Sequence, residues 1–383
     1  MKESSFVKSS VVAVALCFSF VMEAQAAQKS KVIPQEKVTV KSEPQCHPKL
    51  KNYCSEKFYK TQKLTPETQK LIKHIQKFLK FAEKCRKNKS NELTPLEFNR
   101  RFYNKLSRSL RGPLERIRFI LQFYYQDPKD KRDIPLKLYQ DGEKPSNDLV
   151  IFVHGGGWTN GDLESHEYLC RKLTKILQKD VLAIDYRLAP ENPYPAPIDD
   201  IIKIYKKYSN SEYGRVILCG EGSGANLCAS ACLKIKEKRL PRPHASILLY
   251  PALSNDFNSQ SYKTFGNCEA LTAKDAIIYT NNYTGGNCQI PKILSNKSIF
   301  PILENDTDVF PREIVVTAGY DVLYDGQFEH VNKMLNSERN DLTWLVYQGF
   351  VHGFMNFGKY HDKHITQVCQ KIKKCLDHAD GKE

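Results

Sequence analysis

The chain has 383 residues, 41% of them hydrophobic and 26% charged, which is the composition of a globular protein with a full core and excludes a disordered chain. Its formal net charge of +15 is uneven, because residues 49–118 contain 20 Lys and Arg against 6 Glu. Such a charge run is typical of a solvated helical face, although it could attract an anionic membrane surface or an acidic protein. No nucleic-acid-binding module is recognisable, so we expect no nucleic acid as a partner.

The first residues, 1–26, have the pattern of a secretory signal peptide. Lys2 and Lys8 precede an apolar run over residues 11–22, and Ala24-Gln25-Ala26 fits the small-residue cleavage site. The run is shorter than the roughly 20 residues that a membrane-spanning helix needs. We therefore expect an exported protein, periplasmic or secreted.

Cysteines are frequent, and an exported chain can keep disulfides. Of the 12 cysteines, the pairs most plausible from proximity and loop context are Cys46 with Cys54 and Cys268 with Cys288. No paired Cys/His pattern indicates zinc or redox chemistry, and no phosphate-binding loop is present, so we expect neither a metal nor a cofactor.

The chain after the signal segment divides into three parts. Residues 27–60 are polar and Lys-rich and should form a linker or a loosely ordered tail. Residues 61–130 should form a basic helical cap, since Thr65-Pro66-Glu67 and Thr94-Pro95-Leu96-Glu97 are helix-start signals followed by apolar residues at helical spacing. A third amphipathic stretch covers residues 115–125. Residues 131–380 should form the main domain.

The main domain shows apolar runs of strand length that alternate with helical segments. The expected strands are 136–139, 149–153, 181–185, 216–219, 246–250, 313–317 and 343–348, and helices are expected over 167–178, 198–208 and 327–337. The inner runs are continuously apolar, as in strands that helices cover on both faces. The pattern predicts an α/β fold with a mostly parallel central sheet flanked by helices, and a site at the carboxyl ends of the strands.

Two glycine-rich motifs follow strands of this predicted sheet. The first is the run of His154, Gly155, Gly156 and Gly157 after strand 149–153. Glycines let backbone N–H groups converge with no side chain in the way, so this run predicts an oxyanion hole. The second motif, residues 218–228, is close to the G-x-S-x-G turn in which a serine nucleophile lies between a strand and a helix.

These motifs resemble the hormone-sensitive-lipase-like family of α/β-hydrolase esterases, whose signatures are H-G-G-G and G-D-S-A-G. The similarity covers approximately residues 62–375 and includes the runs at 185–191 and 250–253. It implies an α/β-hydrolase fold, an N-terminal helical cap over an acyl pocket, and action on carboxylic esters without a cofactor.

The resemblance also assigns the histidine and its acid. Asp321 matches the carboxylate that orients the histidine, His352 matches the catalytic base, and Asp325 matches a second carboxylate of the same loop. The remaining histidines of the motifs, His154 and His166, are expected to be structural.

The nucleophile is where the chain departs from the family. Gly222 stands at the serine position and Ser223 follows it. If the turn slips by one residue, Ser223 is the nucleophile, and the protein is a secreted carboxylester hydrolase acting on small acyl esters. If the turn does not slip, Ser223 supplies only its backbone N–H to the oxyanion hole. The protein is then an inactive pseudo-hydrolase that binds a small apolar ligand or a protein or membrane partner.

The free-energy cost of slipping favours the turn in which Gly222 keeps the serine position. Slipping would place Glu221 at a position that requires a small residue. It would also rotate the buried face of the following helix by about 100°, given 3.6 residues per turn.

Overall fold

The structure is a computed structural model that describes residues 46–54, 56–87, 93–128 and 131–379. The expected signal segment and most of the expected tail lie outside these residues. Within the described part of the chain, no helix is long and apolar enough to cross a membrane.

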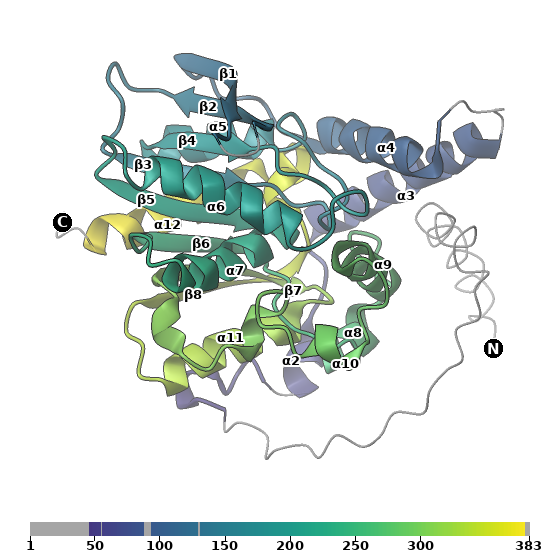
Figure 1. The fold of residues 1–383 in the computed structure, drawn as a ribbon. Coiled ribbons are helices and arrows are strands. Elements are labelled where there is room, and N and C mark those ends of the chain that lie inside the picture. The colour runs from purple at the N-terminus through teal and green to yellow at the C-terminus, as the bar shows by residue number, and fades with distance from the viewer. Residues whose placement is uncertain (1–45, 55, 88–92, 129–130, 380–383) are drawn as a thin grey trace, which may run out of the picture.

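An eight-stranded sheet forms the centre of the molecule, in the order β1-β2-β4-β3-β5-β6-β7-β8 (Figure 1). Six neighbouring strands are parallel, and β1 and β2 add an antiparallel edge. The bounds are β1 Phe119–Gln126, β2 Asp133–Gln140, β3 Asp148–Val153, β4 Asp180–Ile184, β5 Arg215–Glu221, β6 Ala245–Leu249, β7 Arg312–Tyr320 and β8 Leu342–Val351. The predicted α/β fold and all seven predicted strands are confirmed.

Helices cover both faces of the sheet and divide the core in two. The helices α6 (Ala196–Tyr208), α7 (Ser223–Glu237) and α11 (Tyr324–Asn336) pack on one face, and α5 (Glu167–Leu177) and α12 (Gly358–Ala379) pack on the other. Successive residues of β3 point to opposite faces, since Ile151 belongs to the first core and Phe152 to the second. Burial on both faces explains why these strands are continuously apolar.

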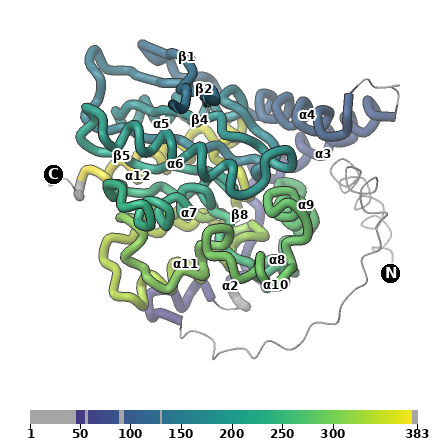
Figure 2. The backbone as a smooth tube through the Cα atoms, viewed as in Figure 1, coloured from purple at the N-terminus to yellow at the C-terminus, as the bar shows by residue number. Residues whose placement is uncertain are grey.

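Helices outside the two layers lie at the carboxyl ends of the parallel strands. Helices α3 (Pro66–Lys87) and α4 (Pro95–Leu110) extend away from the sheet, as both backbone views show (Figures 1 and 2). The capping box of α4 is present, because Thr94 N–H donates to the Glu97 carboxylate at 2.8 Å and Glu97 N–H donates to Thr94 Oγ1 at 3.3 Å. Between β6 and β7 lie α8 (Gln260–Phe265), α9 (Ala273–Thr284) and α10 (Pro291–Leu294), with the 3-10 turns η2 (Pro301–Leu303) and η3 (Thr307–Val309). A further turn, η4 (Phe354–Asn356), follows β8.

Two expectations about the N-terminal part are wrong. The stretch 115–125 is not a helix: it contains β1, which pairs with β2 in a register that places Phe123 opposite Leu136. Its run of aromatic and β-branched residues fits a half-buried strand better than a helix. The sheet therefore begins inside the segment that we assigned to the cap.

The end of the expected tail is ordered against the main domain. It forms η1 (Pro48–Leu50) and α2 (Glu56–Thr61). Phe58 is buried and stacks on Tyr324 with ring centroids 4.4 Å apart, while Tyr53 packs edge-on against Trp344 at 4.9 Å. Aromatic burial therefore fixes this segment in spite of its polar composition.

The expected disulfides are not formed among the described cysteines. Cys46 and Cys54 do come together, but their Sγ atoms are 2.9 Å apart, whereas a disulfide bond measures about 2.05 Å. Cys268 and Cys288 are both buried free thiols.

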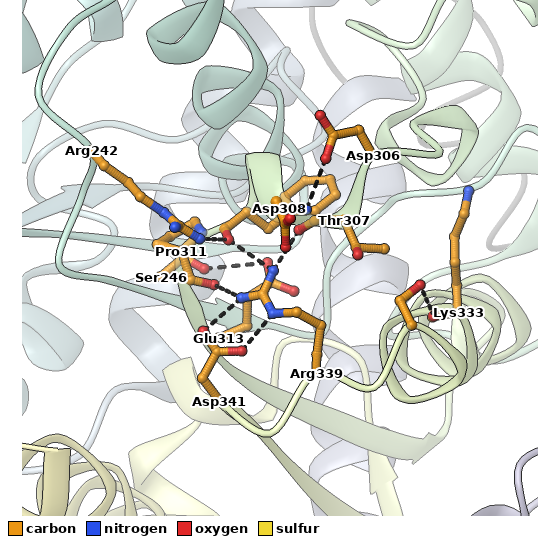
Figure 3. A network of polar contacts seen from close by, with 12 residues as sticks. Arg242, Ser246, Asp306, Thr307, Asp308, Pro311, Glu313, Lys333, Arg339 and Asp341 are labelled. Carbon is orange, nitrogen blue, oxygen red and sulfur yellow. Dashed lines mark hydrogen bonds and ion pairs between the residues drawn. The ribbon is translucent and has the colours of Figure 1, made fainter.

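A polar network joins the amino ends of β6, β7 and β8 (Figure 3). Arg339 pairs with the Asp341 carboxylate, and its guanidinium also donates to Phe310 O at 3.0 Å and to Pro311 O at 2.9 Å. Nearby, the buried Glu313 lies 2.7 Å from His330 Nε2. These contacts connect the loops at the end of the sheet opposite to the glycine motifs.

Candidate active site

The turn of the nucleophile motif is formed by a single residue. β5 ends at Glu221 and α7 begins at Ser223, so Gly222 lies between them. Its backbone has φ 54° and ψ −112°, which a residue with a side chain adopts only under strain. This is the sharp strand-to-helix turn, called the nucleophile elbow, on which α/β hydrolases hold their serine.

The positions two residues before and after Gly222 require glycine because the chain packs closely on itself. A Cβ atom on Gly220 would lie 2.4 Å from the carbonyl carbon of Gly224, and one on Gly224 would lie 2.1 Å from Val153 O. A turn slipped by one residue would bring Glu221 to the first of these positions, where no side chain fits. The structure has the turn that is not slipped.

Residue 222 is the elbow position that faces the histidine. A Cβ atom built on Gly222 would lie 3.0 Å from Nε2 and 3.4 Å from Cε1 of His352. Apart from the flanking residues, no other heavy atom of the described chain lies within 4 Å of that point. The side chain of a residue at 222 would therefore meet His352, and glycine leaves that space open.

Ser223 is engaged in contacts of its own. Its Oγ accepts a hydrogen bond from Trp158 N–H at 3.1 Å. The residue is only 4% exposed, and no hydrogen bond joins it to His352 among the described residues. The hydroxyl of Ser223 thus holds the glycine loop against α7.

The structure brings His352 and Asp321 together as the resemblance implies. His352 Nδ1 lies 2.8 Å from Asp321 Oδ2, and Leu323 N–H donates to Asp321 Oδ1 at 3.0 Å. Burial lowers the pKa of His352, but the charge and hydrogen bond of Asp321, with the charge of Glu221, outweigh it and raise the pKa above its ordinary value. Nε2 therefore faces residue 222 as the free nitrogen of a comparatively basic imidazole.

The other carboxylate of this loop has a different role. Asp325 Oδ2 accepts from Ser261 N–H at 2.7 Å, and Oδ1 accepts from the hydroxyl of Tyr59. It therefore fixes α8 and α2 to the loop rather than orienting the histidine.

The glycine loop is packed so closely that side chains are excluded. A Cβ atom on Gly155 would lie 1.7 Å from Glu221 Oε2, and one on Gly157 would lie 2.2 Å from the ring of Tyr279, while Gly156 has φ 111°. Within the described chain, the amides of Gly156, Gly157 and Ser223 donate to no protein acceptor. Such amides at the floor of a pocket are available to an oxyanion.

A buried acid beside the elbow was missed by the sequence reasoning. Glu221 is 3% exposed, and its Oε2 lies 3.3 Å from His166 Nε2. Burial raises the pKa of Glu221, but the hydrogen bond and charge of His166, with smaller contributions from His352 and Tyr250, lower it below its ordinary value. The signal in the sequence was an acidic residue at the end of an otherwise apolar strand.

The two histidines that we expected to be structural lie behind the glycine loop. His154 Nδ1 is 2.8 Å from Gly155 O, and its pKa is lowered to about 4 by burial and by the neighbouring His166. His154 is therefore neutral at physiological pH. The described residues contain no group of three or more His, Cys, Asp or Glu side chains that could hold a metal ion.

A cavity of about 150 Å³ opens over the elbow. Its floor contains Gly156, Gly157, Ser223 and His352, and its walls come from the cap, from the segment between β6 and β7, and from Phe357 after β8. The walls are mainly apolar and aromatic: Ile75, Leu79, Tyr103, Leu106, Phe257, Tyr262, Leu271, Tyr279, Phe300 and Phe357. A pocket of this kind suits a small molecule with one polar group directed at the elbow.

The cap is fastened to the main domain beside this cavity. Arg100 of α4 donates to Thr159 O at 2.8 Å and to Ala189 O at 3.0 Å, and it forms two hydrogen bonds of 2.8 Å with the Glu191 carboxylate. The two-pronged geometry fixes the orientation of α4 as well as its distance.

The sequence is similar to those of known ester hydrolases. The family described as alpha/beta hydrolase fold matches residues 150–356. Carboxylic ester hydrolase LipN of Mycobacterium tuberculosis is 30% identical over 240 residues, which are 60% of this chain and 63% of LipN, so the match spans less than two thirds of that relative. The arylesterase of Saccharolobus solfataricus is 27% identical over 231 residues, 58% of this chain and 73% of the relative.

Solved structures agree over a larger part of the chain. An ester hydrolase from the metagenome of Lake Arreo, in complex with a bipyridine phosphonate derivative, has a TM-score of 0.70 and 25% identity and covers 83% of this chain and 99% of its own. The hyperthermophilic esterase of Pyrobaculum calidifontis has a TM-score of 0.67 at 21% identity, with the same coverage, and shows the fold alone.

Proposed function

The chain belongs to the alpha/beta hydrolase fold family, within its esterase and lipase lineage, and from this premise we propose that its pocket binds small acyl esters without forming an acyl-enzyme. One observation carries the proposal: the elbow residue that faces His352 is Gly222, which has no side chain. A covalent route requires a nucleophile within hydrogen-bond reach of its base. Gly222 supplies no such atom.

Binding is supported by the parts of the site that the chain retains. The cavity is apolar, the amides of Gly156, Gly157 and Ser223 are available to a carbonyl oxygen, and the pair of His352 with Asp321 is intact. An ester has the matching features, an apolar acyl group and one polarised carbonyl.

The alternative in which Ser223 attacks is less well supported. Its hydroxyl oxygen accepts a hydrogen bond from Trp158 N–H, and a slipped turn would bring Glu221 into a position that admits only glycine. Removal of one triad member typically leaves only about 10³–10⁴-fold acceleration over water.

The decisive test is covalent labelling measured together with binding. A fluorophosphonate probe should leave the wild-type protein unlabelled, as judged by intact-protein mass spectrometry. Labelling of the wild type that Ser223→Ala abolishes would overturn the proposal. Binding is followed with p-nitrobutyranilide, an amide analogue that resists hydrolysis, through the fluorescence of Trp158, which lines the cavity.

A control identifies the fluorescent reporter. The chain has two tryptophans, and the other, Trp344, packs against Tyr53 and Phe328 and not in the cavity. Quenching that disappears in Trp158→Phe therefore reports on the pocket. If p-nitrobutyranilide does not quench the fluorescence of the wild-type protein, the proposed ester binding is wrong.

We also propose that the mature protein is exported and that its cap contacts anionic surfaces. Phe81 on α3 is 47% exposed and lies beside Phe78 in a group that includes Lys70, Lys73 and Lys77. Exposed aromatic rings among lysines favour anionic lipid interfaces. The checks are the N-terminus of protein recovered outside the cytoplasm, expected after residue 26, and flotation with anionic but not neutral vesicles.

A further inference from the structure

We propose that a water molecule takes the place of the missing serine hydroxyl beside Gly222 and attacks the bound ester directly, so that hydrolysis proceeds in one displacement. The inference rests on the proposed non-covalent binding of esters in this pocket. It adds a chemical activity to a site whose elbow residue, Gly222, has no side chain.

The geometry provides a place for this water. The cavity over the elbow is lined by His352, Gly156, Gly157 and Ser223, so a water molecule in the cavity can lie within hydrogen-bond distance of His352 Nε2. A Cβ on residue 222 would project to 3.0 Å from Nε2, and within the described chain no other residue lies within 4 Å of that Cβ, apart from Gly222 and its two neighbours. Glycine therefore leaves the approach to the ring open to a water, which donates to Nε2 and keeps its lone pairs directed at the pocket.

His352 is arranged to accept the proton. Its Nδ1 is hydrogen-bonded to Asp321 at 2.8 Å, so in the neutral imidazole the proton lies on Nδ1 and the lone pair lies on Nε2. The groups that face this ring are the carboxylates of Asp321 and Glu221 and the ring of Tyr250, whose centroid is 5.0 Å away. Both carboxylates stabilise the imidazolium that forms during attack.

The step balances with water as the only co-reactant. The water oxygen forms a bond to the ester carbonyl carbon while its proton passes to His352 Nε2, and the carbonyl electron pair moves onto oxygen. The amides of Gly156, Gly157 and Ser223 stabilise this oxyanion. When the carbonyl re-forms, the bond to the alcohol oxygen breaks, and Nε2 returns the proton to the departing alkoxide.

The substrate class follows from the weakness of the nucleophile. Water held by a histidine is less reactive than an activated serine, and each turnover must pass the barrier without a covalent intermediate. Esters whose alcohol is a good leaving group are therefore the expected substrates, and aryl esters of small acids fit an apolar cavity walled by Tyr103, Phe257 and Tyr279.

The experiment measures hydrolysis of p-nitrophenyl butyrate by the wild type and two variants. We expect the wild type to exceed the buffer rate by about 10³-fold or more, with no initial burst and no acylated protein after acid quench. His352→Gln removes the base and should lower the rate by about 10²–10⁴-fold. Gly222→Ala places a methyl group 3.0 Å from Nε2, where it blocks the approach of the water to the ring, and should lower the rate by a comparable factor.

A matched control separates the methyl group from its position. Gly286 has no atom within 4 Å of an added Cβ, so Gly286→Ala adds the same group in open space and should retain the wild-type rate. His352→Gln provides a test that does not depend on the folding of the Gly222→Ala variant.

The outcomes distinguish this inference from the proposed function. Two outcomes overturn the direct attack of water and leave the proposed ester binding intact. In the first, His352→Gln does not change the rate of hydrolysis. In the second, the wild-type rate equals that of buffer while p-nitrobutyranilide still binds. An acylated wild-type protein overturns both. A wild-type protein that does not bind p-nitrobutyranilide overturns the proposed function, on which the direct attack of water rests.

Discussion

Replacing Gly222 by serine should restore the covalent route, and the structure sets the cost and the gain. The new Cβ lies 3.0 Å from His352 Nε2, closer than most Cβ contacts, so the imidazole must move by a few tenths of an ångström. The φ of 54° with ψ −112° at this position costs an L-residue about 1–3 kcal/mol. At about 2–4 °C per kcal/mol, the melting temperature should fall by roughly 2–12 °C.

The gain in activity should be much larger than this loss suggests. Removing the serine of a triad has cost about 10⁶-fold in kcat in one well-studied protease. Since His352 must shift to accommodate the new side chain, we expect Gly222→Ser to recover at least about 10³-fold in p-nitrophenyl butyrate hydrolysis, about 4 kcal/mol of transition-state stabilisation. The variant should also react with a fluorophosphonate probe at residue 222.

The assay combines labelling, steady-state rates and thermal unfolding. The double variant Gly222→Ser with Ser223→Ala should still be labelled, because the reacting hydroxyl is that of residue 222. A folded Gly222→Ser protein that shows neither labelling nor a gain in rate would refute the conclusion that residue 222 faces His352.

Three further predictions concern proton transfer, loop packing and stability. The rate of ester hydrolysis should fall as the pH drops through the raised pKa of His352, because only the neutral imidazole accepts a proton, so the acid limb should lie above about 6.5. Asp321→Asn should move that limb to lower pH, and an unmoved limb would assign it to another group. Gly155→Ala should abolish binding of p-nitrobutyranilide as measured by Trp fluorescence, because its methyl group would lie 1.7 Å from Glu221 Oε2; retained affinity would mean that the loop can move aside. Arg339→Ala should lower the free energy of unfolding in urea by about 1–3 kcal/mol, because buried carbonyl oxygens lose a charged donor far from the pocket, and ligand affinity should stay constant. A fall in affinity would show that the polar network of Figure 3 acts on the site.

The strands could be predicted because burial on both faces leaves a clear pattern. Runs such as β3 and β5 are continuously apolar, and their lengths separate them from helices. The edge strand β1 lacks this pattern, since its residues alternate between exposed and half-buried positions, and its aromatic residues also fit an amphipathic helix. Pairing with β2 decides between the two, and pairing is not visible in a local window.

The site shows the same division between local and distant signals. The glycine loop and the elbow could be located from short motifs, because each follows directly after a strand. Glu221 and Tyr279 were missed as parts of the site, since their roles depend on close approaches to Gly155 and Gly157 that only the folded chain creates. The choice between Gly222 and Ser223 likewise depends on the packing of Gly220, which sequence reasoning could weigh only as a cost.

The fastening of α4 by Arg100 has a consequence for how quickly a ligand can exchange. The cavity is walled on one side by α3 and α4, and Arg100 holds α4 to the loop at Glu191 through a pair that is partly exposed to solvent. We expect a ligand beneath these helices to leave when they separate from the main domain, and salt weakens the Arg100–Glu191 contact that opposes this separation. Residence time should therefore shorten with ionic strength while the contacts in the pocket stay the same, which stopped-flow dissociation can measure. The cap would then be a kinetic barrier to ligand exchange, and the rate at which it separates from the main domain would limit the rates of ligand dissociation and binding.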